Sequence, residues 1–541
     1  MSGGIKSCVF LWTAIVALLS FSACGGGGGG TAPPPNTYTV GGTVSRLSGT
    51  VVLQNNGGNN LPVSADGSFT FTTPVANGGG YSVTVLTQPS SPAHTCAVTN
   101  GSGTSNAKIS SVQVFCSGEW TWVSGANVIN QMGTYGTQGA GAPSNVPGAR
   151  YGSVGWKDAN GDPWLFGGYG YDSGIVPVGE LNDFWKFSAG EWTWMSGSNV
   201  ANTPGIYGTL GMPAPGNAPG GRHTAAASTD AAGNFWAFGG LGLAASGAAD
   251  LNDLWKYSGG EWTWMSGSNL PGQVPTYGTL GTAAPGNVPG ARFASASWTD
   301  AGGNFWLFGG QGRDTTGHVG FLNDLWRYSA GEWTWMSGAN GIGQAGTYGT
   351  LGTAAPSNVP GARSDAVAWE DGAGNFWLFG GQTATGATFS NLNDLWKYSA
   401  GEWTWMGGAN VPNQKGTYGT EGTAAANNIP GARINPVGWV DANGDFWFFG
   451  GSGLDSAGTT GQLNDLWKYS AGEWTWMSGA NLASQTGIYG TQGMATPSNI
   501  PGARFLAVGW TDTSGNLWLF GGTNLNGIGT SDFNDLWKYE P

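Results

Sequence analysis

Six arginines are the residues of this chain best suited to bind a charged ligand. Each follows a Pro-Gly-(Ala/Gly) tripeptide, and they recur at Arg150, Arg222, Arg292, Arg363, Arg433 and Arg504. A guanidinium presents a planar fork of N–H donors that matches a carboxylate or a phosphate. The arginines could therefore bind anions on a shared surface. They could equally pair with the aspartate of a second repeated phrase, Asn-Asp-(Leu/Phe)-Trp-(Lys/Arg)-(Tyr/Phe).

Metal and redox chemistry have few candidate residues in the repeated part of the chain. No cysteine follows Cys116, and the only histidines after it are His223 and His318. The stretches 158–162 and 441–445 both read Asp-Ala-Asn-Gly-Asp, but they lack the spaced ligands and the distal Glu of a calcium loop. We expect both stretches to be hairpin turns, and we expect no metal and no cofactor.

The composition limits the class of protein to which the chain can belong and the kind of partner that it can bind. The net charge of −13 offers no basic face, so a nucleic-acid partner is not expected. Hydrophobic residues make up 40% of the chain and tryptophans number 30, which is typical of a folded protein rather than a disordered one. With 101 glycines in 541 residues, the sequence indicates a turn-rich, all-β fold.

The tetrapeptide Glu-Trp-Thr-Trp marks a repeating unit. Successive copies lie 70 to 72 residues apart, and the six copies start at Glu119, Glu191, Glu261, Glu332, Glu402 and Glu473. A fixed period of this length indicates one supersecondary unit copied along the chain. The first copy stands alone, whereas the last Asn-Asp phrase has no Glu-Trp-Thr-Trp after it. We therefore expect the two ends of the array to meet and close a ring.

Each unit reads as four antiparallel strands. The third unit runs from Arg292 to a turn at 300–304, continues through the apolar stretch 305–308, and then reaches the phrase 322–328 and the tetrapeptide 332–335. An apolar aromatic run of this kind is typical of a strand buried on both faces. In an up-and-down unit the two short turns share one face, and the two long connections share the other.

The arginine, the Gly-Gly after an aromatic strand, the Asn-Asp-Leu-Trp-Lys-Tyr phrase and the late tryptophan together resemble the kelch repeat. All six copies carry these four elements. The resemblance implies a six-bladed kelch β-propeller over residues 118–541, closed by strand 119–122. The period exceeds the usual kelch length of about 50 residues. The excess lies in the 27 residues between the last tryptophan of each tetrapeptide and the next arginine.

The kelch resemblance brings two enzyme classes into consideration. A galactose-oxidase-like copper enzyme needs a Cys–Tyr crosslink and histidine ligands, which this chain cannot supply after Cys116. A sialic-acid mutarotase is an exported six-bladed kelch protein, and that activity stays open. It would use the arginines with a carboxylate such as Glu180 or Glu421. Otherwise catalysis has little support, and we expect no catalytic residue.

The first 36 residues predict export and a tether. Lys6, the apolar run 9–19 and the small residues before Cys24 are typical of a signal peptide, and the run is too short for a transmembrane helix. Cys24 after Ser-Ala resembles the lipobox of bacterial lipoproteins, which implies a lipid on Cys24 after removal of the signal within 1–24. Residues 25–36 are a Gly/Pro linker. We expect a bacterial cell-envelope or outer-membrane lipoprotein, with plain secretion as the alternative.

Residues 37–117 predict a separate small domain. Short alternating β patterns are divided by turns such as 55–58, which favours an all-β sandwich. It resembles the immunoglobulin-like domains that precede larger modules in bacterial surface lipoproteins. Cys96 and Cys116 are the two cysteines left in an exported chain and are expected to form a disulfide. Because Cys116 lies just before Glu119, the sandwich should sit on the short-turn side of the ring.

Variation between the copies indicates where a ligand would bind. The loops between strands two and three differ from copy to copy, whereas the tryptophans after Trp12 occupy repeated strand positions and are expected to pack between blades. Together with the six arginines, the candidate binding face comprises Tyr171, Asp172, Arg313, Asp314, His318 and Asp455. We expect a monomeric, lipid-anchored module that recognises a protein or a polysaccharide through its long-loop face. The alternative interpretation is that these loops differ through neutral drift and bind nothing.

Overall fold

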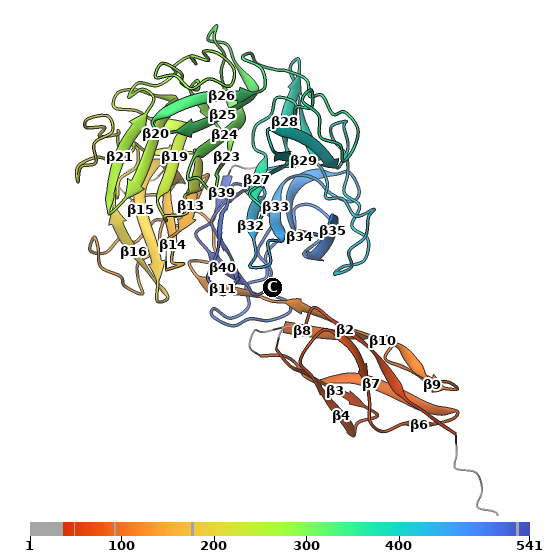
Figure 1. Ribbon diagram of the computed structural model, residues 1–541. Coiled ribbons are helices and arrows are strands. Elements are labelled where there is room, and N and C mark those ends of the chain that lie inside the picture. The colour runs from red at the N-terminus through yellow and green to blue at the C-terminus, as the bar shows by residue number, and fades with distance from the viewer. Residues whose placement is uncertain (1–35, 48, 91–93, 159, 175–177, 526–529) are drawn as a thin grey trace, which may run out of the picture.

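The computed structural model describes residues 36–47, 49–90, 94–158, 160–174, 178–525 and 530–541. Within these ranges the protein is entirely β, without a helix, and forms a ring of radial sheets with a smaller domain at one side (Figure 1). The predicted fold class, a six-bladed propeller preceded by a small disulfide-containing sandwich, is confirmed. The predicted lipobox cysteine Cys24 and almost all of the linker lie outside the described residues.

The first three blades each consist of one radial sheet. Blade 1 contains β12 (Arg150–Tyr151), β13 (Val154–Lys157), β14 (Pro163–Gly170), β15 (Gly179–Ser188) and β16 (Glu191–Ser196). Blade 2 contains β17 (Arg222–His223), β18 (Ala226–Thr229), β19 (Phe235–Leu243), β20 (Ala248–Ser258) and β21 (Glu261–Ser266). Blade 3 contains β22 (Arg292–Phe293), β23 (Ala296–Thr299), β24 (Phe305–Arg313), β25 (Val319–Ser329) and β26 (Glu332–Ser337).

The last three blades repeat this plan. Blade 4 contains β27 (Val367–Glu370), β28 (Phe376–Thr385), β29 (Thr388–Ser399) and β30 (Glu402–Gly407). Blade 5 contains β31 (Arg433–Ile434), β32 (Val437–Val440), β33 (Phe446–Leu454), β34 (Thr460–Ser470) and β35 (Glu473–Ser478). Blade 6 contains β36 (Val508–Thr511), β37 (Leu517–Phe520), β40 (Leu536–Tyr539) and, from the first part of the repeat array, β11 (Trp120–Ser124). Between β37 and β40 in the sequence, β38 (Thr523–Leu525) and β39 (Thr530–Asp532) form a separate two-stranded sheet.

Blade 6 closes the ring with strands from both ends of the repeat array. β11 pairs antiparallel with β40, and Trp120 lies opposite Tyr539 and Trp122 opposite Trp537 (Figure 1). Trp120 is buried against the neighbouring blade, with its ring centroid 5.4 Å from that of Phe449. An open sheet edge would otherwise remain at this seam. The strand 119–122 therefore joins the first and last parts of the propeller.

The 27-residue connections explain the long period of the repeat. Each one leaves the outer strand of a blade and runs along the outer strand of the next blade. Single β-bridges mark its path at Ala142–Trp192, Ala214–Trp262, Ala284–Trp333, Ala355–Trp403, Ala425–Trp474 and, at the seam, Thr496–Trp120. A buried asparagine in each connection, such as Asn145, donates to the backbone of that tryptophan. The extra residues thus cover strand edges that would otherwise be exposed.

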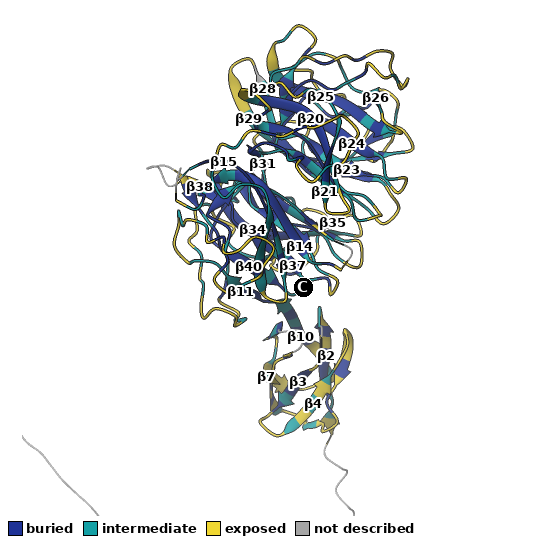
Figure 2. Cartoon of the chain, turned by 90° about the vertical axis from the view of Figure 1, so that its left-hand side faces the viewer, coloured by how far each residue is buried: buried dark blue, intermediate teal, exposed yellow. Residues whose placement is uncertain are grey.

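Aromatic side chains from adjacent blades form the core. Trp156 of blade 1 stacks on Phe235 of blade 2 with centroids 3.7 Å apart, and Trp369 of blade 4 stacks on Phe446 of blade 5 at 3.5 Å. Buried residues run through the radial strands, whereas exposed residues gather in the outer loops (Figure 2). Packing between blades therefore accounts for the repeated tryptophans, as the sequence predicts.

The small domain is a sandwich of two four-stranded sheets. One sheet has the order β5 (Gly67–Thr70), β2 (Val40–Ser45), β10 (Ile109–Gly118), β8 (His94–Thr99). The other has the order β4 (Asn59–Val63), β3 (Val51–Asn55), β7 (Gly79–Thr87), β9 (Ser102–Ser105), and β1 (Thr37–Tyr38) pairs with β6 (Val75–Ala76). The predicted disulfide Cys96–Cys116 is present and links the neighbouring strands β8 and β10 of one sheet.

The sandwich meets the ring at the short-turn end of blade 6 and at the outer rim of blade 5. His94 Nε2 lies 3.1 Å from the carbonyl oxygen of Pro541, and Thr95 donates a hydrogen bond to Glu119. Arg46 lies over the ring of Phe115 and contacts Met477. No helix that is long and apolar enough to span a membrane occurs in the described part of the chain.

Candidate functional site

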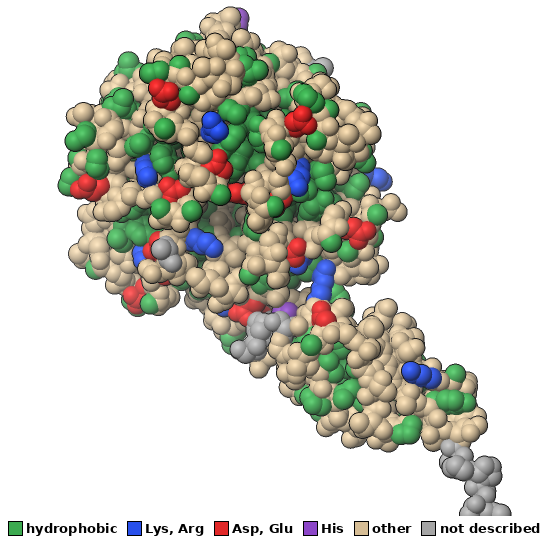
Figure 3. All heavy atoms as spheres, in the orientation of Figure 1, with side chains coloured by type: hydrophobic (Ala, Val, Ile, Leu, Met, Phe, Trp, Pro, Cys, Tyr) green, Lys and Arg blue, Asp and Glu red, His purple; other side chains and the backbone are tan. Residues whose placement is uncertain are grey.

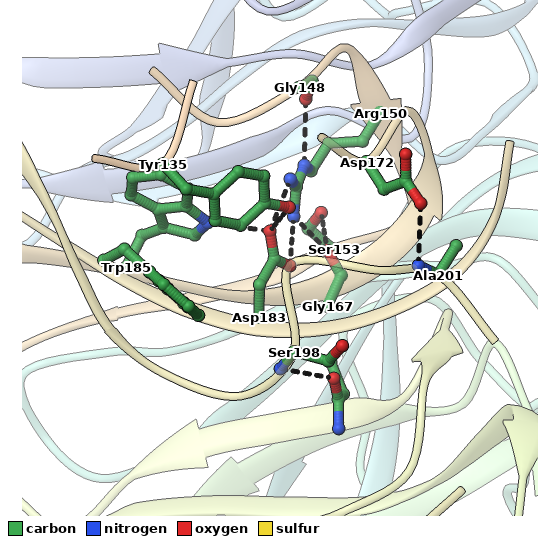
Figure 4. Close-up of polar contacts among 12 residues, drawn as sticks. Tyr135, Gly148, Arg150, Ser153, Gly167, Asp172, Asp183, Trp185, Ser198 and Ala201 are labelled. Carbon is green, nitrogen blue, oxygen red and sulfur yellow. Dashed lines mark hydrogen bonds and ion pairs between the residues drawn. The ribbon is translucent and has the colours of Figure 1, made fainter. Parts of the chain in front are cut away.

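The six arginines are buried in one repeated cluster, shown for blade 1 in Figure 4. Arg150 donates from Nη1 to Asp183 Oδ1 at 2.6 Å and from Nη2 to Asp183 Oδ2 at 2.7 Å. Its remaining donors reach the carbonyl oxygens of Gly148 at 2.9 Å and Gly167 at 3.0 Å. The hydroxyl of Tyr135 and the indole N–H of Trp185 also donate to Asp183, at 2.6 and 2.8 Å.

The other five blades repeat this cluster, so its role is structural. The equivalent Arg–Asp–Tyr sets are Arg222–Asp253–Tyr207, Arg292–Asp324–Tyr277, Arg363–Asp394–Tyr348, Arg433–Asp465–Tyr418 and Arg504–Asp535–Tyr489. Each tyrosine comes from the connection that leaves the preceding blade, so each cluster ties two blades together. Burial alone would lower the pKa of Arg150, but Asp183 outweighs it and the net pKa is raised.

The prediction that these arginines contribute to a ligand-binding face is therefore wrong. All six are 0 to 1% exposed, and each guanidinium is held by an aspartate and backbone carbonyl groups. The structure instead shows the alternative interpretation of the sequence, in which each arginine pairs with the aspartate of the Asn-Asp phrase. A buried, hydrogen-bonded ion pair of this kind cannot release its cation to a ligand without a large cost.

Three carboxylates predicted at the candidate face organise their own loops. Asp172 accepts from the backbone of Gly174 and Ala201. Asp314 and Asp455 accept from backbone N–H groups two and four residues ahead in their own loops. All three side chains are buried, at 0%, 8% and 2% exposure. The carboxylates therefore shape the long-loop face without presenting their charge on it.

The other three loop residues differ from one another in exposure. Tyr171 is half-buried, and burial followed by the charge of Asp532 raises its pKa. Arg313 pairs with Asp250 of the neighbouring blade, Nε to Oδ2 at 3.0 Å. His318 has 75% of its side chain exposed. These residues lie on the long-loop face but belong to blades 1 and 3, so the structure does not gather them into one site.

A closed ring of backbone hydrogen bonds narrows the central channel. The residue two positions after each arginine donates its N–H to the carbonyl oxygen of the equivalent residue in the preceding blade, at 2.7 to 3.3 Å. We call this set the septum ring: Gly152, Thr224, Ala294, Asp365, Asn435 and Leu506. All six have positive φ, from 49° to 63°, although five of them are not glycine. This strained conformation turns each N–H toward the adjacent blade.

Above the septum ring, on the long-loop side, four residues of blades 1 and 2 form a cluster that no prediction included as a whole. The rings of Tyr151 and Tyr169 lie 5.5 Å apart, and the ring of His223 lies 5.8 Å from each. His223 Nδ1 is 3.0 Å from Glu180 Oε2 and 3.1 Å from Oε1. We call these four residues the mouth cluster. They combine two phenol rings with a carboxylate and an imidazole.

The mouth cluster contains both hydrogen-bond donors and hydrogen-bond acceptors. Burial, then Asp532, Tyr169 and Glu180, raise the pKa of Tyr151 to about 12, so its phenol keeps its proton. Because a carboxylate only accepts, the proton on His223 Nδ1 is donated to Glu180, which leaves the other ring nitrogen for a ligand. The side chains of His223 and Glu180 are 14 and 15% exposed. The cluster can therefore donate, accept and stack on a ligand at the same time.

A comparison between copies could have found the mouth cluster from the sequence. The residue after each arginine varies, with five residue types at six positions, and we call these positions the mouth row: Tyr151, His223, Phe293, Ser364, Ile434 and Phe505. Glu180 was considered for a mutarotase, but its partner was expected to be an arginine and is His223. Glu421, the other carboxylate considered, lies in the connection along the outer strand of blade 5, beside the sandwich residue Phe115 and not beside an arginine cluster.

The two Asp-Ala-Asn-Gly-Asp stretches are hairpin turns. Asp158 accepts from the backbone of Asn160 and Asp162, and Lys186 Nζ lies 2.9 Å from a carboxylate oxygen of both Asp158 and Asp162. Lys468 is placed in the same way beside Asp441 and Asp445. A lysine ammonium thus lies between the two carboxylates that a calcium loop would have offered to the metal.

Comparison with known proteins finds similarity in structure alone. No protein-family model and no curated protein matches the chain. The structure of YjhT aligns with a TM-score of 0.42 and 13% identity over 72% of this chain and 95% of its own length. A copper-bound fungal alcohol oxidase of the AA5 family aligns with a TM-score of 0.39 and 12% identity over 76% of this chain and 77% of its own. Neither similarity assigns a role to a residue of this chain.

Proposed function

We propose that this protein is a binding module of the bacterial cell envelope that takes a polysaccharide on the long-loop face of its propeller. One observation carries the proposal: the mouth row varies among the six blades, whereas the arginine directly before it is the same in all six. Variation on a fixed scaffold is how binding surfaces are built. The mouth cluster is the part of this row where aromatic and polar side chains converge.

The chemistry of the mouth cluster favours a sugar ligand. Tyr151 and Tyr169 offer ring faces for the apolar side of a pyranose and phenol hydroxyl groups as donors. Glu180 and the second ring nitrogen of His223 offer acceptors for the hydroxyl groups of the sugar. The septum ring lies directly below and narrows the channel. The ligand would therefore rest in the mouth rather than thread the ring. A protein ligand is the alternative outcome of the test below.

A glycan array probed with residues 37–541 tests the proposal. Glycans that bind should lose at least tenfold in affinity for the double variant Tyr151→Ala/Tyr169→Ala. The matched control is Ile434→Ala, which changes the mouth row on the far side of the ring. Equal affinity of all three proteins for every glycan would exclude the mouth cluster. Capture of an envelope protein by the wild type, but not by the double variant, would instead favour a protein ligand.

Anomer exchange of sialic acid is a second candidate function, favoured by the Glu180–His223 pair. A carboxylate 3.0 Å from an imidazole can move a proton, as ring opening of a sugar requires. The arginines that such an enzyme would use for the substrate carboxylate are buried, which counts against it. NMR exchange spectroscopy decides the question. Acceleration by micromolar protein that disappears in Glu180→Gln would support the activity, and no acceleration would end it.

The lipid anchor on Cys24 remains part of the proposal. The contacts described between the sandwich and the ring lie at the short-turn end of blade 6 and the rim of blade 5. A tether leading into the sandwich would thus leave the long-loop mouth open to a ligand. Cys24→Ala should move the protein from the membrane fraction to the soluble fraction of cells. Retention of the variant in membranes would exclude the anchor.

A further inference from the structure

The short-turn side of the ring contains a second concavity. A cavity of about 740 Å³ lies there, lined by the ends of the innermost strands and by the adjoining turns of blades 1 to 3. We call it the funnel. Figure 3 shows positively and negatively charged side chains spaced around a hollow at the centre of the ring. A volume of this size is typical of sites for small molecules.

The funnel is separate from the mouth cluster. A smaller space of about 150 Å³ lies between them and is lined by the septum ring and its neighbours. The backbone hydrogen bonds of the septum ring join all six blades at this level. A ligand in the funnel would therefore be bounded by the septum ring at its inner end, and its site would not overlap the one proposed on the long-loop face.

The funnel wall departs from the repeat at one position in each blade. The residue after the inner tryptophan, or after Ser228 in blade 2, is threonine in three blades and differs in the other three; the six residues are Lys157, Thr229, Thr299, Glu370, Val440 and Thr511. The two charged members are Lys157 of blade 1 and Glu370 of blade 4. In a ring of six blades these two stand on opposite walls. At these six positions the funnel therefore has one cation and one anion, on opposite walls.

The anionic side lacks a cation of its own. Asp158, Asp230, Asp371 and Asp441 of the short turns each lie within 3.8 Å of a lysine ammonium. Asp300, in the short turn of blade 3, has no such ion pair among the described residues, and neither has Asp512 of blade 6, where Lys538 pairs with Glu540. Arg327, the cation of blade 3, lies over the ring of Trp306. Of these two aspartates, Asp300 is the one whose charge acts on Glu370. Asp300 and Glu370 are therefore neighbouring carboxylates that share no cation.

Glu370 is the less well accommodated of the two carboxylates. It is half-buried, and its carboxylate accepts no hydrogen bond in the described structure, whereas the carboxylate of Asp300 accepts from Gly302, Asn304 and Trp306. Burial, then the charges of Asp300 and Asp371, raise the pKa of Glu370 to about 7. A ligand ammonium beside Glu370 would relieve this repulsion. A site poised for a charged group is expected to show this kind of perturbation.

We propose that the funnel binds a small zwitterion, with its ammonium group beside Glu370 and Asp300 and its acidic group beside Lys157. The opposed charges favour a ligand that carries both groups at its two ends. The exposed Lys157 and the half-buried Glu370 both line the funnel. The threonines between them add hydroxyl oxygens to its wall, although Thr299 and Thr511 already donate to the preceding blade.

Calorimetry with ω-amino acids of increasing length tests this proposal on residues 37–541. The probes are glycine, γ-aminobutyrate and 6-aminohexanoate, extended by triglycine, and the single-charge controls are hexylamine and hexanoate. We expect at least one zwitterion to bind, and the single-charge controls to bind at least tenfold more weakly. Glu370→Gln and Lys157→Met should each weaken the zwitterion at least tenfold. Lys108→Met, which removes an exposed positive charge from the sandwich and not from the funnel wall, should not.

Two results would overturn the proposal. One is that none of the zwitterions binds to the folded wild type. The other is binding that is unchanged in both Glu370→Gln and Lys157→Met, which would place the ligand elsewhere. The double variant Tyr151→Ala/Tyr169→Ala should bind the zwitterion like the wild type. The proposal for the funnel and the proposal for the long-loop face can therefore be contradicted or supported independently of each other.

Discussion

Arg222 and His223 are adjacent in the sequence and belong to two different regions of the molecule. Arg222 is 1% exposed and fixed between Asp253 and backbone carbonyl groups, in an arrangement that all six blades share. His223 lies in the mouth cluster beside Glu180, and no other blade has a histidine at this position. Repetition therefore marks the residues that hold the ring together, and the lack of it marks the surface free to change.

The same contrast recurs along the whole innermost strand. The arginine and, in five blades, the tryptophan near its far end are constant, whereas the mouth row, the septum ring and the funnel positions vary. Constant residues pack between blades, where one misfit would affect two sheets. Variable residues lie at three levels of the channel: the mouth row at one end, the septum ring in the middle and the funnel positions at the other end. Each of the following experiments tests whether this division holds.

Deleting the closing strand should have the largest effect. A chain that starts at residue 118 keeps β11, whereas a chain that starts at 123 loses Trp120 and Trp122 and leaves the edge of β40 unpaired. We expect the first chain to form a stable propeller that unfolds in one cooperative transition. We expect the second chain to aggregate, or to unfold without a cooperative transition. Calorimetry and size-exclusion chromatography would show the difference. A well-folded monomer starting at 123 would contradict the closure.

Breaking one arginine cluster should cost several kcal/mol. Arg222→Ala leaves Asp253 buried without its cation, which typically costs 3–5 kcal/mol. His223→Ala, one residue further on, removes a side chain that is 14% exposed but belongs to no repeated cluster, and should cost less than about 1 kcal/mol. Urea unfolding of the two variants measures the contrast. Similar losses in both would mean that the arginine layer and the mouth row are not distinct regions.

The acidic side of the funnel should make stability depend weakly on pH. Folding raises the pKa of Glu370 from 4.5 to about 7, so the folded protein binds more protons than the unfolded chain between these values. Stability from this group is therefore lost as pH rises through that window. Glu370→Gln should gain on the order of 1 kcal/mol relative to wild type between pH 4.5 and 8, because partial exposure reduces the full effect. A constant difference across this range would show that Glu370 is not perturbed.

Most of the fold could be predicted because the repeats supplied their own internal comparison. Six copies of Glu-Trp-Thr-Trp gave the number of blades, and the unmatched copy at Glu119 gave the closing strand. The path of the 27-residue connections could not be predicted. Their route along the next blade depends on hydrogen bonds such as Asn145 to Trp192, which join residues far apart in the sequence.

The candidate site was predicted less well, for a physical reason. The sequence allowed each arginine two roles, binding a ligand or pairing with the aspartate of the Asn-Asp phrase. Burial and the contact with an aspartate such as Asp183 decide for the second role, and burial is not visible before the fold is known. The opposite holds for Glu180 and His223. They lie 43 residues apart, and only the register between adjacent blades brings them to 3.0 Å.

The affinity of one bound glycan for His223→Ala and Ile434→Ala tests the central claim most directly. Both residues occupy the mouth row, on opposite sides of the ring, and the unfolding free energy is measured on the same samples. The account predicts at least tenfold weaker binding for His223→Ala, unchanged binding for Ile434→Ala, and for His223→Ala a stability within about 1 kcal/mol of wild type. Equal binding by both variants, or a loss of binding that follows a loss of stability, would contradict it.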